Sequence, residues 1–229
     1  MSNPLRDLSK IEWVIWIGSL IVVTVSNVVS GDLDLLTLLA ALIGVTSLIF
    51  AAKGNVWAQV FMIVFSILYG IISWRFRYWG EMITYLGMTM PMAIWSTITW
   101  LKNPSEKNAN EVAIQKLNWK QIAALVFFCF AVTVAFYFLL RFLNTPNIIF
   151  STISITTSFL AASLTMLRSS YYALGYASND IVLIILWVLA SMENPKYIPV
   201  VVIFFIFFIN DMYGFISWKK RELEQNLKS

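Results

Sequence analysis

Asp211 is the residue whose type and position suggest chemistry most directly. It lies about two helical turns before Trp218, well inside an apolar stretch rather than at its edge. An ionisable side chain in hydrocarbon is costly, so it faces a cavity or a polar partner. We interpret Asp211 as an acceptor for sugar hydroxyls or as the counter-charge of a cationic substrate. The alternative interpretation is a hydrogen bond between helices, for example to Asn179, with the acid protonated.

Amide and aromatic side chains recur at helical spacing around Asp211 and in an earlier stretch. Asn55 and Gln59 lie on one face of a predicted helix, because residues four apart share a face. The predicted substrate-binding residues are Asn55, Gln59, Trp95, Tyr172, Tyr176, Asn179, Asn210, Asp211 and Tyr213. Amides, hydroxyls and flat rings suit a neutral or singly charged ring-plus-sugar molecule. They do not suit a phosphate, which favours clustered Arg or Lys. Amides that only join helices remain the alternative.

The side-chain inventory argues against several other classes of protein. The chain has no His, which removes Ser-His and Cys-His catalysis and His metal sites. The single Cys129 cannot form an intramolecular disulfide. We therefore expect no metal, no cofactor and no enzyme, although a membrane-embedded enzyme and a receptor are the non-transport alternatives. The net charge of +4 is modest and gathers beside apolar segments, so no nucleic-acid partner is expected.

Composition predicts that lipid is the main solvent. Hydrophobic residues make up 59% of the 229 residues and charged residues 12%, against about 25% charged in soluble domains. A spanning helix needs about 20 mostly apolar residues. Eight such segments are predicted, approximately Ile11–Val29, Asp34–Ala51, Val56–Ser73, Met82–Leu101, Gln121–Phe142, Ile148–Leu167, Asp180–Ser191 and Tyr197–Trp218. The predicted fold class is an all-α integral membrane protein, with residues 1–229 as a single membrane domain.

The basic residues predict the orientation in the membrane. With eight spans, 12 of the 16 Lys and Arg residues fall on the side that holds both termini. Cytoplasmic loops carry the excess of basic residues, so both termini are predicted to be cytoplasmic in the cell membrane. The longest polar stretch, Asn103 to Lys120, falls on the same side, and we interpret it as an ordinary charged linker.

Two stretches of the chain repeat a pattern. Residues 93–102 read AIWSTITWLK and residues 211–220 read DMYGFISWKK, 118 positions later. We predict an N-terminal helix (11–30), a first triple-helix unit (34–102), a loop and linker helix (103–145) and a second triple-helix unit (148–220). A single linker helix gives both units the same orientation, which is the parallel 3+1+3 plan of SWEET-like carriers.

These residues resemble the Pnu-type vitamin transporters. The resemblance rests on GNVWAQVFMIVFSILYG to AIWSTITWLK (54–102) and on SNDIVLIILW to FINDMYGFISWKK (178–220). It implies a SWEET-like fold, a single midplane site between the units, and facilitated diffusion of nicotinamide riboside. It also implies a homo-oligomer, and a cytosolic kinase that retains the substrate by phosphorylating it.

One departure leaves the substrate open. Nicotinamide riboside carriers of this family place a W-x-x-W pair before the penultimate helix, where this chain has Tyr172 and Tyr176. A deoxynucleoside carrier for salvage is therefore the alternative, and thiamine is a further candidate substrate. A proton-coupled carrier that uses Asp211 is the second transport variant.

Overall fold

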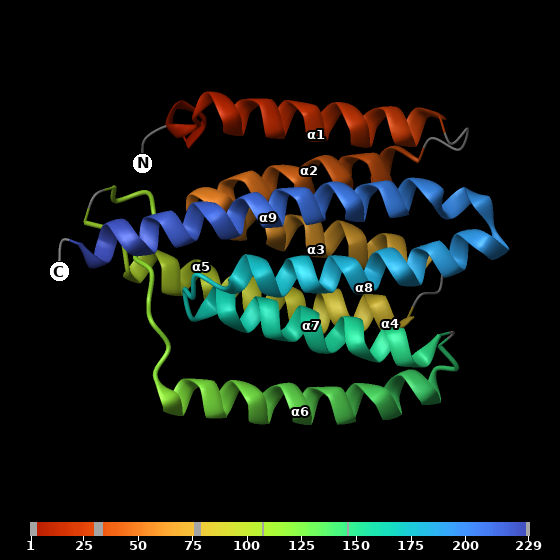
Figure 1. The fold of residues 1–229 in the computed structure, drawn as a ribbon. Helices are drawn as coiled ribbons and strands as arrows, with labels where there is room; N and C mark the ends of the chain where they lie inside the picture. Colours follow the sequence, from red (N-terminus) through yellow and green to blue (C-terminus); the bar gives the residue numbers. More distant parts are fainter. Residues whose placement is uncertain (1–3, 30–33, 76–78, 107, 146, 228–229) are drawn as a thin grey trace.

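The computed structural model describes residues 4–29, 34–75, 79–106, 108–145 and 147–227 as a bundle of long helices (Figure 1). Their bounds are α1 Lys10–Val29, α2 Leu35–Lys53, α3 Trp57–Arg75, α4 Trp79–Thr84, α5 Met90–Lys102, α6 Trp119–Phe142, α7 Ile148–Met166, α8 Tyr172–Glu193 and α9 Ile198–Asn226. Short 3-10 turns precede α1 and α9, at Pro4–Asp7 and Pro195–Tyr197. Seven of the described helices are long and apolar enough to cross a membrane.

The fourth predicted span, Met82–Leu101, is a helix with a widened turn. Segments α4 and α5 are joined by a π-helical turn, Tyr85–Thr89, so that Trp79–Lys102 is continuously helical. The amide of Met90 donates to Tyr85, one residue farther back than in an α-helix. Pro91 follows directly, and its ring has no N–H and crowds the carbonyl four residues earlier. The local widening is the kind of adjustment that marks functional sites in helices.

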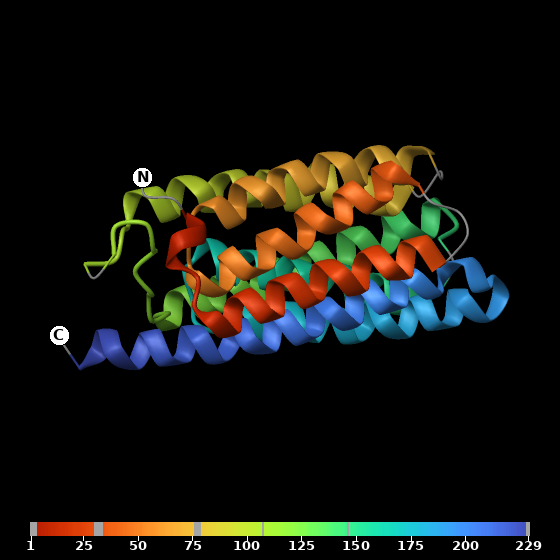
Figure 2. The same ribbon diagram turned by 90° about the horizontal axis from the view of Figure 1, so that it is seen from above.

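Two helices are longer than the sequence predicted. The penultimate helix begins at Tyr172 rather than Asp180, and the last one continues past Trp218 to Asn226. The first turns of α8 carry tyrosines and small residues that are buried against protein, so hydropathy alone gave the wrong boundary. Beyond Trp218, α9 is charged and projects past the bundle at the end where the chain begins (Figure 2).

The helices pack as two trios with α1 and α6 outside them. In the first, α3 packs against α2, α4 and α5; in the second, α8 packs against α7 and α9. Helix α1 covers α2 and α9, while α6 packs on α7 at the opposite edge (Figure 1). Almost every side chain of α6 faces outward, and only Leu140 is buried. The arrangement is nearly all-helical, as predicted.

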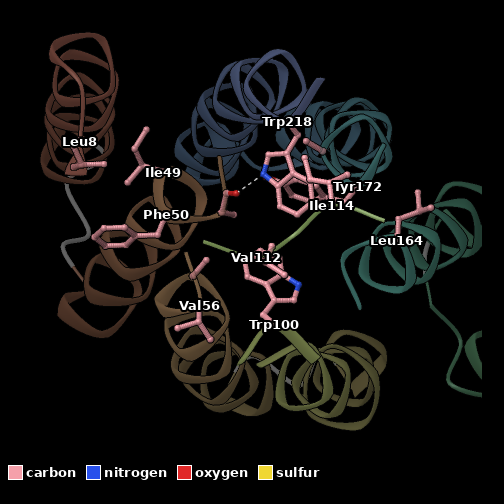
Figure 3. Packing of buried hydrophobic residues seen from close by; sticks show 13 residues of the cluster. Leu8, Ile49, Phe50, Val56, Trp100, Val112, Ile114, Leu164, Tyr172 and Trp218 are labelled. Carbon is pink, nitrogen blue, oxygen red and sulfur yellow. Dashed lines mark hydrogen bonds between the residues drawn. The ribbon is translucent and has the colours of Figure 1, made fainter. Parts of the chain in front are cut away.

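The two trios exchange equivalent hydrogen bonds. The indole N–H of Trp100 donates to the carbonyl of Thr165 in α7 at 3.0 Å, and that of Trp218 donates to Ala51 in α2 at 2.8 Å. The two indole rings lie 5.6 Å apart between the trios (Figure 3). Thr165 and Ala51 occupy the same place, three residues before the left-handed residue that ends the first helix of each trio. This reciprocity is what the predicted internal repeat requires.

The polar stretch after α5 is bound across the end of the bundle. We call residues 103–118 the strap. The amide of Val112 donates to the carbonyl of Gly54, and the amide of Gln115 donates to that of Arg168, so one segment holds both trios. The side chain of Arg221 donates to Val112 at 2.9 Å and pairs with Glu111 at 3.2 Å. The interpretation of this stretch as an ordinary charged linker was therefore wrong.

Candidate substrate site

A layer of buried polar side chains crosses the second trio. Asn179 in α8 accepts from the hydroxyl of Thr157 at 2.8 Å. Asn210 in α9 donates to Ser19 of α1 at 2.9 Å. The carboxyl groups of Asp180 and Asp211 lie close together, and the two residues are only 3% and 4% exposed. Two buried carboxyls this close do not readily ionise together, because like charges repel strongly where the dielectric is low.

Two acceptors in this layer have no hydrogen-bond partner. They are Oδ2 of Asp180 and Oδ1 of Asn210, and both atoms are buried. A buried acceptor without a donor costs about 1–3 kcal/mol, so native structures retain few of them. Both atoms are of the type that accepts a sugar hydroxyl or an amide N–H. The layer is thus acceptor-rich.

The structure brings several predicted residues together and separates others. Asn179, Asn210 and Asp211 share the polar layer. Tyr176 lies next to it, because it comes one helical turn before Asp180 in α8. Asp180, which the predicted set did not include, belongs to the same layer.

Four other predicted residues lie toward the end of the bundle that carries the strap. The ring of Tyr172 stands 4.5 Å from that of Trp218 in a cluster closed by Val112 and Ile114 (Figure 3). The side chain of Asn55 accepts from the amide of Trp57 and so begins α3. Tyr213 donates to Glu12 at 3.0 Å, and Gln59 is buried in the first turn of α3.

Trp95 stands apart from the other predicted residues. It is 62% exposed on the outer surface of α5. Its predicted binding role remains an untested prediction, as do those of the other residues in the set.

Two cavities lie in the half of the bundle away from the strap. Their volumes are about 360 and 660 Å³. The side chains common to both walls are Tyr69, Glu81, Trp187, Asn194, Tyr197 and Phe204. None of the nine predicted residues lines either cavity. Sequence reasoning missed Glu81 because it placed the start of that helix at Met82, which left the acid in a loop.

The cavity walls are acidic and aromatic. Their charged residues are Asp34, Glu81 and Glu193, and no Lys or Arg is among the described residues that line them. Asp34 is partly neutralised by Arg75 at 4.0 Å. Glu81 shares a hydrogen bond with Tyr69, whose ring lies 4.4 Å from that of Tyr85.

Tyr85 connects the cavities to the polar layer. It lines the larger cavity together with Glu81 and with Leu183 of α8, which lies three residues after Asp180. It is also the first residue of the π-helical turn. The wall of the larger cavity therefore adjoins the part of α8 that carries Asp180.

Comparison with known proteins places the chain in a family. Residues 34–220 match the family model described as "Nicotinamide mononucleotide transporter". The chain belongs to this family. It is a multi-pass membrane transporter and not an enzyme.

Individual relatives of the nicotinamide mononucleotide transporter family agree with this placement. A nicotinamide riboside transporter PnuC of Neisseria mucosa is 26% identical over 79% of this chain and 70% of its own. That of Haemophilus influenzae is 22% identical over 90% of this chain and 89% of its own. The crystal structure of the vitamin B3 transporter PnuC matches the fold with a TM-score of 0.79 at 24% identity, over 93% of this chain and 92% of that one. The predicted resemblance to Pnu-type transporters is confirmed.

Proposed function

We propose that this protein carries nicotinamide riboside across the cell membrane by facilitated diffusion through a single midplane site. The observation that carries the proposal is the buried, acceptor-rich layer around Asp180 and Asp211. Ribose hydroxyls are donors, and the pyridinium ring is a cation, so both parts of the substrate complement such a layer. The two relatives named for nicotinamide riboside support the same substrate.

The substrate proposed is the riboside rather than the mononucleotide named in the family description. A phosphate in a site of low dielectric is held by Arg or Lys, most strongly as a bidentate pair. The described cavity walls carry three acids and no base. A phosphomonoester would therefore meet repulsion along this route, whereas a riboside cation would meet attraction.

Each residue has a proposed role in binding. Asp180 and Asp211 accept from ribose hydroxyls. Asn179 and Asn210 supply amide contacts to the sugar or to the carboxamide. Tyr176 presents a flat face to the ring, in place of the tryptophan of the family motif, since aromatic rings stack at low conformational cost.

Movement of the two trios against each other would expose the polar layer to one side of the membrane and then to the other. The end that carries the strap is closed by the Trp100–Trp218 pair, while the cavities occupy the other half. We propose that the trios rock about the layer and that the strap end is cytoplasmic. Net uptake then depends on a cytosolic kinase that phosphorylates the substrate, and the carrier works as a homo-oligomer, both by analogy with the family.

Calorimetry on the purified full-length protein tests the substrate. We expect saturable binding of nicotinamide riboside and at least about 100-fold weaker binding of the mononucleotide, a difference of about 2.7 kcal/mol. Thymidine, deoxyadenosine and thiamine are the comparison ligands. Preferential binding of a deoxynucleoside would move the function to nucleoside salvage. Tight binding of the mononucleotide would contradict the argument from charge.

A proton-coupled carrier is the second candidate, and the closeness of the two buried carboxyl groups of Asp180 and Asp211 is the observation that favours it. A shared proton between two buried carboxyls is a group that substrate binding could release. Proteoliposomes with and without an imposed pH gradient distinguish the two mechanisms. Accumulation of labelled nicotinamide riboside above the outside concentration under the gradient would establish coupling. Equal concentrations on both sides would establish facilitated diffusion.

A further inference from the structure

The cavity half of the molecule contains a group of side chains that the midplane site does not use. Glu81 and Tyr69 share a hydrogen bond, and Tyr85 packs on Tyr69. Trp187 and Tyr197, whose rings stand 5.4 Å apart, line the same two cavities. One carboxyl and three aromatic rings thus line both cavities, and the ring of Tyr85 lines the larger one.

The chemistry of this group selects a ligand class. A carboxylate attracts a cation, and aromatic faces attract it further by about 0.5–2 kcal/mol, more when water is excluded. The polar wall includes Ser73, whose hydroxyl is buried and has no hydrogen-bond partner. Such a hydroxyl offers a donor and acceptor to a ligand. A flat organic cation fits these features, while anions and neutral alkyl compounds do not.

The position of the group gives it a distinct role. Tyr85 stands on the π-helical turn and lines the larger cavity together with Glu81 and with Leu183, which lies about one helical turn from Asp180. A ligand bound at Glu81 therefore occupies a cavity whose wall adjoins the midplane layer.

We propose that Glu81, Tyr69, Tyr85, Trp187 and Tyr197 form an outer binding site for a flat aromatic cation, which then passes Tyr85 to reach the midplane layer. This deepens the proposed function and rests on it for the identity of the transported cation. The outer site selects for the positive charge of the ligand, and the midplane layer binds its sugar hydroxyls.

Two small probes that differ in charge test the outer site without the ribose. They are 1-methylnicotinamide, a pyridinium cation, and nicotinamide, its neutral counterpart. Binding to the full-length protein in detergent is measured by calorimetry. We expect the cation to bind about tenfold more tightly than the neutral ring, which corresponds to about 1.4 kcal/mol.

The decisive variant is Glu81→Gln, with Glu193→Gln as its matched control. Both acids line the larger cavity, but Glu193 is exposed at the end of α8. Glu81→Gln should reduce the preference for the cation to within about twofold, while Glu193→Gln should retain it. Glu81→Asp keeps the charge and should keep most of the preference for the cation. Its result shows that the loss in Glu81→Gln comes from the missing charge and not from misfolding. Equal binding of both probes to the unmodified protein, or an unchanged preference in Glu81→Gln, would overturn the proposal.

Transport assays separate this proposal from the proposed function. In proteoliposomes, Glu81→Gln should raise the KM for nicotinamide riboside about tenfold and leave kcat within about twofold, because the outer site acts on capture rather than on the midplane step. If nicotinamide riboside is not transported but the cation preference still depends on Glu81, the proposed function fails and the outer site stands. If transport occurs with an unchanged KM in Glu81→Gln, the outer site fails and the proposed function stands.

Discussion

Asp180 and Asp211 are adjacent in space although they come from different helices. Their carboxyl groups lie close together and are nearly fully buried, and Oδ2 of Asp180 has no hydrogen-bond partner. Replacing one carboxyl by an amide keeps the shape and supplies a donor to the other, so folding should survive. What is lost is an acceptor for the substrate.

Asp211→Asn should therefore weaken binding with little effect on stability. We expect nicotinamide riboside affinity to fall about 10- to 100-fold, since hydrogen bonds to charged groups contribute about 1.5–3 kcal/mol. Calorimetry measures the affinity, and thermal unfolding measures the stability. Asp34→Asn is the control, because this acid is paired with Arg75 and caps α2, a role that Asn fills equally well. Unchanged affinity in Asp211→Asn would contradict the proposed role.

Two glycines give a stability prediction of opposite sign. Gly54 ends α2 with φ of 69° and lies against the guanidinium of Arg221, so a Cβ there meets both strain and a clash. Gly18 is inside α1, with nothing within 4 Å of an added Cβ. Gly54→Ala should lower the free energy of unfolding by at least about 1–2 kcal/mol, while Gly18→Ala should raise it by about 0.5–1 kcal/mol. Denaturant titration followed by circular dichroism measures both; equal effects would contradict the geometry.

The element that departs most from regular helical geometry is the helix Trp79–Lys102, whose turn Tyr85–Thr89 is π-helical. A π turn contains one more residue than an α-helical turn. The turn therefore changes the direction in which the side chains of α4 point, relative to those of α5. Glu81 and Tyr85 lie before or within this turn, and Trp100 lies after it. The turn thus decides that the acid faces the cavities while the C-terminal part still packs against α3 and α7.

Pro91→Ala tests this element. An alanine restores the missing N–H and lets the turn tighten to an α-helix, which rotates the preceding residues by about 100°. We expect a protein that is at least as stable thermally but has transport reduced about tenfold or more. Pro195→Ala is the control, since that proline lies in the exposed turn before α9. Full transport in Pro91→Ala would show that the widened turn is dispensable.

At the scale of the whole molecule, the two ends of the bundle differ. The strap, the Trp100–Trp218 pair and both chain ends gather at one end (Figures 1 and 3). The cavities, with their three acidic residues, occupy the other half. Such asymmetry between otherwise similar trios is what a carrier closed on one side shows.

Cysteine labelling tests which end faces the cytoplasm. Cys129 is the only cysteine of the chain, so Cys129→Ala gives a background for single cysteines. On that background, Ala109→Cys in the strap should react with a membrane-impermeant maleimide only after the cells are opened. Asn194→Cys, exposed at the cavity end, should react in intact cells. The reverse pattern would invert the proposed orientation.

The sequence by itself determined the features that depend on local physics. Apolar runs long enough to span a bilayer fixed the helices and the class of protein, since backbone groups in lipid must be satisfied within the segment. The repeated decapeptides ending near Trp100 and Trp218 indicated the two equivalent trios. The type of Asp211, a carboxyl in an apolar stretch, predicted a polar partner or a cavity inside the bundle.

Only the tertiary structure decided which side chains share a site. Asp180 meets Asp211 because α8 packs along α9, and Trp95 faces outward because it lies on the side of α5 that no neighbouring helix covers. Glu81 faces the cavities because the π-helical turn Tyr85–Thr89 rotates the helix that carries it. A sequence pattern with a period of 3.6 residues does not predict this rotation. These contacts depend on helix rotation and on packing between segments remote in the chain, and a local sequence pattern carries neither.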